Sequence, residues 1–252
     1  MHHNTQWKKF REWLLSPLGQ SLITEQSEKI NEFIQMVFGF HIVFLGEPPL
    51  LKGLQESPIL HRVWIHPAAE PLKECDAVIA RQDKLPIMQD EIDLVYLAHC
   101  LEFNLNPHEV LREAYAALKP GGHLIISGFN AWSSWGLWRY LVHYIKPVPW
   151  DANFISLKRL KDWLALLGFD VVQIKSCFFR PPIERGTWLE KMRWIEKVGN
   201  FLFSPLGASY VILARKRALT LTPLRVEWKR RRRMVPAGFA EPVRRGLRRG
   251  QI

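Results

Sequence analysis

The sequence predicts a three-layer α/β fold, in which helices cover both faces of a mainly parallel β-sheet. Three observations in one segment support this prediction. Residues 92–98 form a near-continuous apolar run, which is typical of a parallel strand buried on both faces. Residues 107–118 place apolar side chains on one helical stripe, and a second short apolar run follows at residues 124–127. A strand, a helix and a strand in this order predict a right-handed βαβ unit.

The ends of that helix are marked by residues with known preferences. Asn106 is expected to cap the helix with its side chain, and Pro107 occupies the first helical position, where a missing N–H costs nothing. Pro120, Gly121 and Gly122 are expected to form a turn that ends the helix before the strand at residues 124–127.

The remaining elements follow from the same kind of pattern. Two helices are expected within residues 5–38, joined at the Ser-Pro-Leu-Gly segment 16–19. A helix beginning after Ser156 should run to Leu167 and end at Gly168. Apolar runs predict five further strands, at residues 41–45, 61–65, 77–80, 169–174 and 208–214. The chain therefore supplies seven strands with helices between them.

The net charge of +11 is concentrated at one end of the chain. Residues 215–252 hold 13 of the 35 Lys and Arg residues and two of the 24 Asp and Glu residues, so residues 1–214 hold 22 of each sign. Residues 218–252 are therefore predicted to be a disordered basic tail. The tail could bind nucleic acid or an anionic surface through counterion release, or it could be a solvated extension without function.

The predicted organisation has three parts. Residues 1–39 form a helical cover, residues 40–217 form the α/β domain, and residues 218–252 form the tail. The domain carries an aromatic insertion at 130–150 and a helical insertion at 178–207. Three scattered cysteines fit neither a disulfide framework nor a metal site, and no apolar run is long enough for a transmembrane segment. Together with the absence of a signal-peptide pattern, this predicts a cytoplasmic protein.

A set of short motifs resembles a known family. The motifs are Asp83 with Leu85-Pro86, Asp93-Leu94-Val95, Ala98-His99 with Leu101-Glu102, and Leu118-Lys119-Pro120-Gly121-Gly122. In this order and spacing they resemble the core of class I S-adenosylmethionine-dependent methyltransferases, in particular the bacterial type-11 group. The resemblance covers about residues 40–217. It implies a Rossmann-like seven-stranded sheet with the last strand antiparallel, bound S-adenosylmethionine, and methyl transfer to an unidentified acceptor.

The resemblance also assigns cofactor-binding roles, although two of the expected features are altered. Gly46 stands where the family has a glycine-rich loop, but Glu47, Pro48 and Pro49 replace the flexible turn and remove two N–H donors. His66 ends the second strand where a carboxylate usually accepts hydrogen bonds from the ribose, and a neutral imidazole accepts only one.

The rest of the expected cofactor pocket is present. By the resemblance, Asp83 would meet the adenine amino group, Leu85 would wall the ring, and Ala98 and His99 would line the methionine end. His99 is the candidate catalytic residue, because its pKa suits a general base and it follows a central strand. The alternative is that His99 has a structural role, packing under the loop that follows.

The aromatic insertion has two interpretations. Trp132, Trp135 and Trp138 recur every three residues, so a helix would place them on one drifting face. That face could contact a flat or apolar substrate or a membrane surface, or it could pack against the N-terminal helices.

The leading hypothesis is thus a methyltransferase that uses S-adenosylmethionine, with the 130–150 segment over the acceptor. The alternative is a catalytically inactive methyltransferase fold that binds nucleic acid or a protein partner through the basic tail. A third interpretation is a peripheral membrane enzyme with a lipid-soluble substrate.

Overall fold

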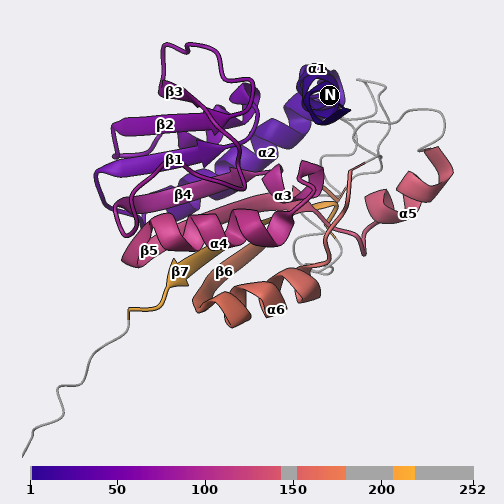
Figure 1. Cartoon of the computed structure of the whole chain (residues 1–252). Helices are drawn as coiled ribbons and strands as arrows, with labels where there is room; N and C mark the ends of the chain where they lie inside the picture. Colours follow the sequence, from indigo (N-terminus) through magenta and orange to yellow (C-terminus); the bar gives the residue numbers. More distant parts are fainter. Residues whose placement is uncertain (1, 143–151, 180–206, 219–252) are drawn as a thin grey trace, which may run out of the picture. The chain divides into compact units, whose positions relative to one another are not determined.

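The computed structural model describes residues 2–142, 152–179 and 207–218. Seven strands form a single sheet in the order β3-β2-β1-β4-β5-β7-β6 (Figure 1). The strands are β1 (His41–Leu45), β2 (His61–His66), β3 (Asp76–Ile79), β4 (Ile92–Ala98), β5 (Leu118–Phe129), β6 (Phe169–Cys177) and β7 (Ser209–Lys216). The first five strands are parallel, and β7 runs antiparallel between β5 and β6. This confirms the predicted fold class and the placement of the last strand.

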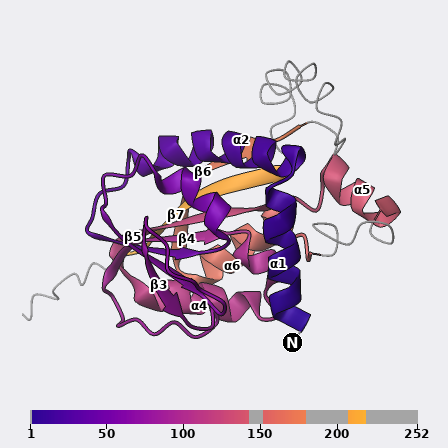
Figure 2. The same ribbon diagram turned by 90° about the horizontal axis from the view of Figure 1, so that it is seen from above.

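Helices cover both faces of the sheet. They are α1 (His2–Leu14), α2 (Pro17–Ile34), the 3-10 helix η1 (Pro48–Leu54), α3 (Cys100–Phe103), α4 (Pro107–Ala117), α5 (Ser134–Val142) and α6 (Leu157–Leu167). On one face α2 packs against η1, β6 and β7, and on the other α4 packs against β5 and α6. Figure 2 shows α2 lying along the sheet while α1 crosses at one end of the strands.

The predicted start of β5 was wrong. The strand begins at Leu118, immediately after α4, so that Pro120, Gly121 and Gly122 lie within it and do not form a separate turn. Leu118 is fully buried and pairs with Ile92, and the ladder then shifts register before Leu94 pairs with His123. Pairing at the start of β4 therefore outweighs the turn preference of the Pro-Gly-Gly segment, and the extra residues are absorbed as a bulge.

The helix-capping predictions had mixed outcomes. Ser156 caps α6 by accepting from the backbone N–H of Arg159, and Gly168 ends the helix with a left-handed φ of 89°. Asn106 does occupy the position before α4, but its side chain makes no capping hydrogen bond there. It interacts instead with Asp83, whose pKa it helps to lower.

A buried lysine at the end of β7 forms hydrogen bonds with residues at and near the C-terminal end of α4. Lys216, at the end of β7, donates through Nζ to Asp90 Oδ1 at 2.7 Å. The same ammonium group donates to the carbonyl oxygens of Tyr115 and Leu118 at 2.8 and 2.7 Å. Three acceptors thus satisfy a lysine that is only 7 % exposed.

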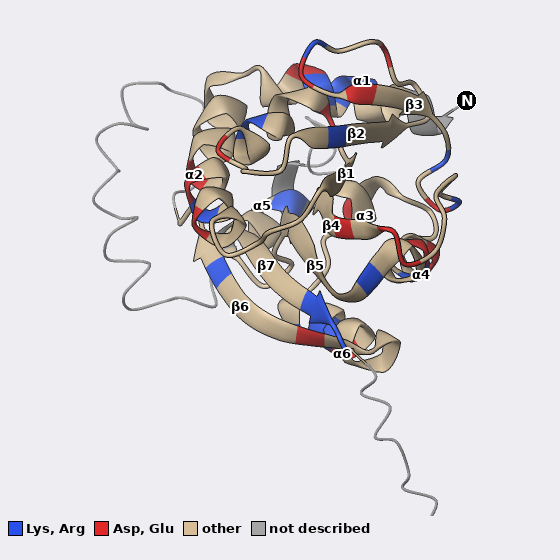
Figure 3. Ribbon diagram, turned by 90° about the vertical axis from the view of Figure 1, so that its left-hand side faces the viewer, with Lys and Arg blue, Asp and Glu red and all other residues tan. Residues whose placement is uncertain are grey.

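The charged residues are distributed over the described part of the chain. In the view of Figure 3, acidic and basic positions are interspersed over several elements.

No helix of the described residues has the length and apolar character needed to cross a membrane. Residues 180–206 of the predicted helical insertion, positions 143–150 of the aromatic insertion and the tail from residue 219 lie outside the described residues.

Candidate functional site

The carboxyl ends of β1 and β4 approach each other closely at Gly46. A Cβ atom at Gly46 would lie 2.7 Å from both the Cβ atom and the carbonyl oxygen of Ala98. Only glycine fits at this distance, since real Cβ contacts of that length do not occur. The carbonyl oxygen of Gly46 accepts from Trp64 Nε1 of β2 at 2.8 Å, which joins three neighbouring strands at this edge.

Glu47 follows Gly46 and is completely buried. Arg11 of α1 donates from Nε to its Oε2 at 2.5 Å, and His66 Nε2 lies 3.5 Å from its Oε1. Burial raises the pKa of Glu47, and the hydrogen bond and charge of Arg11 oppose that increase. Pro48 and Pro49 then occupy the start of η1, where missing N–H groups are tolerated. The altered loop therefore presents a buried carboxylate that is tied to the N-terminal helix.

Aromatic side chains of α1 cover this edge of the sheet. The Trp7 ring centroid lies 5.2 Å from that of His66 and 5.2 Å from that of Phe103. Phe10 lies 4.5 Å from Phe103, and 5.6 Å from His99. Both α1 residues are at most 1 % exposed. The helix therefore closes the crevice that opens at the carboxyl ends of β1, β2 and β4 in a doubly wound sheet.

His99 lies at the centre of a buried polar cluster. Its Nε2 atom is 2.9 Å from Nε2 and 3.2 Å from Oε1 of Gln26 in α2, and its Nδ1 atom is 3.5 Å from Glu102 Oε1. The residue is fully buried with a left-handed φ of 51°, a conformation that non-glycine residues adopt only in defined contexts. Glu102 also accepts from the backbone N–H of Phe129 at 2.6 Å. His99 is therefore held between α2 and α3, and its Nδ1 atom has no hydrogen-bond partner among the described atoms.

The connection from β3 to β4 carries the other predicted cofactor residues. Asp83 accepts two hydrogen bonds from Arg81, at 2.8 and 2.6 Å, and this pairing lowers the pKa of Asp83. The backbone N–H of Leu85 donates to Glu113 of α4 at 2.7 Å, and its side chain is half-buried against the core.

Gln82, which the sequence patterns did not single out, is the buried polar residue of this connection. It is 2 % exposed, and its Oε1 accepts from Cys100 Sγ at 3.2 Å. Its Nε2 donor has no hydrogen-bond partner among the described atoms. A buried amide donor without a partner is costly, so its position is suited to a ligand acceptor.

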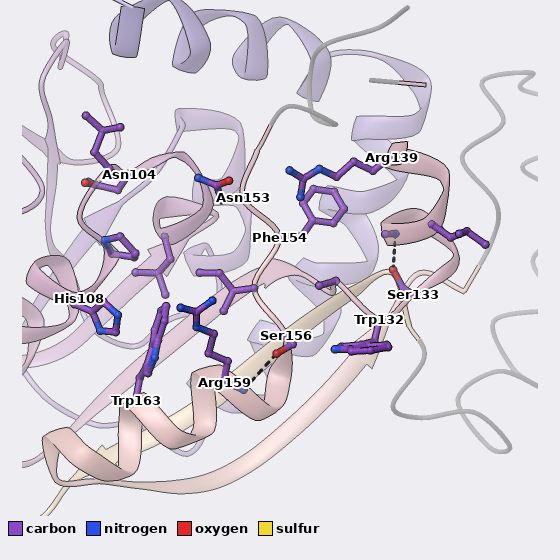
Figure 4. A pocket seen from close by; sticks show the side chains of 17 residues that line it. Asn104, His108, Trp132, Ser133, Arg139, Asn153, Phe154, Ser156, Arg159 and Trp163 are labelled. Atoms are coloured by element: carbon purple, nitrogen blue, oxygen red, sulfur yellow. Dashed lines mark hydrogen bonds between the residues drawn. The ribbon is translucent and has the colours of Figure 1, made fainter. Parts of the chain in front are cut away.

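A cavity of about 840 Å³ lies on the other side of α3. Three segments line it: the chain from α3 into α4, the start of α5, and the chain entering α6 (Figure 4). Its residues are Leu101, Asn104, Leu105, Pro107, His108, Ala131, Trp132, Ser133, Gly136, Leu137, Arg139, Asn153, Phe154, Ile155, Ser156, Arg159 and Trp163. The cavity thus follows β4 and β5, at the edge where ligands bind in sheets of this kind.

The three tryptophans do not share one face, contrary to the sequence prediction. Trp132 precedes α5 and is 77 % exposed, because the helix begins only at Ser134. Trp135 is fully buried, with its ring 6.2 Å from Trp13 of α1, which agrees with packing on the N-terminal helices. Trp138 is 40 % exposed.

The structure brings together four of the six predicted site residues. Gly46, His66, Ala98 and His99 meet beneath α1, while Asp83 and Leu85 lie on the adjacent β3–β4 connection. The sequence predicted a helical cover at residues 1–39, but it did not identify which side chains of α1 cover this edge. The spacing of Trp7, Phe10 and Leu14 gives a helical stripe that indicates burial, but not what it covers. Among the described residues no group of three His, Cys, Asp or Glu side chains is arranged to hold a metal.

Comparisons with known proteins agree with this architecture. Residues 51–174 match a family model described as a methyltransferase domain. YafS of Escherichia coli is 29% identical over 210 residues, which span 83% of this chain and 82% of that protein. The chloroplastic 2-methyl-6-phytyl-1,4-hydroquinone methyltransferase of Arabidopsis thaliana is 30% identical over 186 residues, covering 64% and 54% of the two chains.

A solved structure shows the same fold. It is a SAM-dependent methyltransferase from Thermotoga maritima, titled a possible histamine N-methyltransferase. It is 18% identical, with a TM-score of 0.58, and the match covers 84% of this chain and 100% of that one. At this level of identity, the similarity establishes the arrangement of strands and helices.

Proposed function

We propose that the chain is an S-adenosylmethionine-dependent methyltransferase that transfers a methyl group to an acceptor held in the cavity beside α5, because residues 51–174 match a methyltransferase-domain model and the fold is that of class I methyltransferases. The proposal rests on the positions of two neighbouring sites. The cofactor edge at Gly46 and Ala98 and the cavity both lie at the carboxyl ends of the central strands, on either side of α3. S-adenosylmethionine is the cofactor that the family implies.

The residues at the cofactor edge fit an adenosyl group in their chemistry. Gly46 allows a close approach to the backbone, and the buried Nε2 donor of Gln82 is suited to a ring nitrogen of adenine. Asp83 is held ionised by Arg81 and would accept a hydrogen bond from the amino group, with Leu85 beside the ring. His66 and Ala98 complete the set at the ends of β2 and β4.

Access requires α1 to move, because Trp7 and Phe10 cover this edge. Arg11 holds the helix in place through Glu47. Closure of this kind excludes water from a reacting centre, which strengthens electrostatic interactions inside it. The same helix therefore acts as a cover that opens for the cofactor and shields it afterwards.

The chain's own residues contribute mainly by positioning. When bound, S-adenosylmethionine would supply an electrophilic methyl group to a nucleophilic heteroatom of the acceptor. Holding the acceptor in line with the methyl group accounts for much of the rate in such reactions. His99 is held by Gln26 and lies 3.5 Å from Glu102, so its role as a base would require it to exchange these contacts.

Binding of the cofactor is the direct test. At a ligand concentration of about 100 times Kd, binding stabilises the folded state by about 2.7 kcal/mol, which raises Tm by about 5–10 °C in a protein of this size. We expect this shift with S-adenosylmethionine and with its demethylated product. No shift at millimolar ligand would favour the alternative, a methyltransferase fold that serves as a binding module.

Two variants locate the site. Gln82→Ala and Asp83→Ala should each reduce the shift, because each removes a proposed contact with adenine. Gln173→Ala and Asp170→Ala provide matched controls, since both residues are exposed on β6, away from the cofactor edge. If both site variants keep the wild-type Tm shift with S-adenosylmethionine, the adenine must bind elsewhere.

A further inference from the structure

Among the described residues, the cavity beside α5 is lined by basic side chains and by no acidic ones. Two arginines line it, Arg139 of α5 and Arg159 of α6, while no aspartate or glutamate is among its residues. At about 840 Å³ the cavity falls within the range of small-molecule sites. Its occupant should therefore be a small molecule with negative charge.

Neither cavity arginine is neutralised within the described part of the chain. Arg139 Cζ lies 5.3 Å from the ring centroid of Phe154, and Arg159 Cζ lies 5.1 Å from that of Trp163. Four other arginines of the described residues pair with carboxylates, namely Arg11, Arg81, Arg112 and Arg217. Two more, Arg62 and Arg215, donate to backbone carbonyl oxygens. A guanidinium placed beside a ring keeps N–H donors that can bind a carboxylate or a phosphate.

Four of the residues that line the cavity carry aromatic rings, namely His108, Trp132, Phe154 and Trp163. The ring of His108 lies 3.9 Å from that of Trp163, so that Arg159, Trp163 and His108 form one group (Figure 4). Trp132 contributes an indole ring that is 77 % exposed. An exposed indole ring such as that of Trp132 can stack on a planar molecule.

We propose that this cavity binds a small planar molecule that carries a carboxylate or phosphate group, with the anion held by Arg139 and Arg159. Its role as the methyl acceptor rests on the proposed function, whereas the preference for a planar anion rests on the cavity alone. The flat body would lie against the exposed ring of Trp132. The nucleophilic atom would be directed toward α3 and the cofactor edge beyond it.

Binding of three probes to the full chain tests the charge preference. The probes are naphthoate, its methyl ester, and naphthyl phosphate, measured by isothermal titration calorimetry. A charge-assisted hydrogen bond contributes enough for about a tenfold or larger change in Kd. We expect both anions to bind at least about tenfold more tightly than the ester. The tighter of the two anions identifies which acidic group the arginines prefer.

Charge-removing variants assign the effect to the two arginines. Arg139→Gln and Arg159→Gln should each weaken naphthoate binding about tenfold while changing ester binding less than about twofold. Arg159→Lys is a milder variant that retains charge but loses the planar fork, and it should weaken naphthoate binding to an intermediate degree. Arg217→Gln is the control, since Arg217 pairs with Asp170 on an exposed surface away from the cavity.

Equal affinity for naphthoate and its ester would overturn the proposal, as would unchanged naphthoate binding in both glutamine variants. The cofactor titration keeps this result separate from the proposed function. Arginine-dependent naphthoate binding without any shift from S-adenosylmethionine would support the planar-anion site and contradict methyl transfer. A Tm shift with S-adenosylmethionine together with equal affinity for naphthoate and its ester would support methyl transfer and contradict the planar-anion site.

Discussion

Replacing Arg11 with alanine should destabilise the protein more at neutral pH than at acidic pH. Arg11 Nε is 2.5 Å from Glu47 Oε2, and the Glu47 side chain is completely buried. Without Arg11 the carboxylate would remain buried next to His66 Nε2 at 3.5 Å. Breaking a buried ion pair in this way usually costs about 3–5 kcal/mol, because an uncompensated charge is left behind.

Protonation of Glu47 limits that cost. Each pH unit corresponds to about 1.36 kcal/mol, so holding a carboxyl with a reference pKa of 4.5 in its neutral form at pH 7 costs at most about 3.4 kcal/mol. Burial already raises the pKa of Glu47 in the wild type, so the additional loss must lie below this ceiling. A loss of about 2 kcal/mol would lower Tm by about 4–8 °C in a protein of this length.

The sign of the pH dependence follows from proton binding. With a folded-state pKa above 4.5, the folded protein keeps its proton on Glu47 at pH values where the unfolded chain has lost it. This contribution to stability is present below pH 4.5 and is lost as the pH rises through the raised pKa. Removing Arg11 raises that pKa further, because its hydrogen bond and charge act in the lowering direction. The difference between wild type and variant should therefore grow with pH.

Urea unfolding at about pH 5 and pH 7 measures this difference. The Arg11→Ala variant should lose clearly more stability at the higher pH. In the double variant with Glu47→Gln, the pH-dependent part should disappear, leaving only the lost packing of the arginine stem. The same loss at both pH values would refute the reasoning, since it would mean that Glu47 carries no uncompensated charge.

Three further variants test the site and its surroundings. Gly46→Ala should cost about 1–3 kcal/mol, because the new Cβ atom would lie 2.7 Å from Ala98, and an unchanged Tm would show that the strand ends relax freely. Phe10→Ala should cost about 3–5 kcal/mol yet enlarge the Tm shift given by S-adenosylmethionine, whereas the control Phe169→Ala, equally buried, should cost stability without enlarging it. Lys216→Met should cost about 1–3 kcal/mol in urea unfolding, because the carbonyl oxygens of Tyr115 and Leu118 lose their donor, and a neutral result would mean that water replaces the ammonium group.

The strands could be predicted from the sequence because each buried run has a local pattern. Residues 41–45 and 92–98 were predicted with the bounds that the structure shows. Leu118 was assigned to the helix because its apolar character also fits the helical stripe. Its partner Ile92 is 26 positions away in the sequence, so no local pattern contains the pairing that decides it.

The candidate site was predictable in part for the same reason. Gly46 and Ala98 were identified through the resemblance to the methyltransferase family, and both lie at strand ends, where parallel strands bring their carboxyl ends to one edge. The contact of Gln82 with Cys100, and the pairing of Arg139 and Arg159 with aromatic rings, depend on loops whose paths only tertiary packing sets.

The sequence by itself thus determined the class of fold, the order of its strands along the chain and the edge at which ligands bind. Those properties follow from hydrophobic periodicity and from the residues that begin and end helices. Only the tertiary structure decided that α1 covers the cofactor edge, that Glu47 is buried against Arg11, and that the cavity beside α5 is lined by arginines without carboxylate partners among the described residues. Side chains that meet across long sequence separations have no local signature, because burial and charge pairing are properties of the packed molecule.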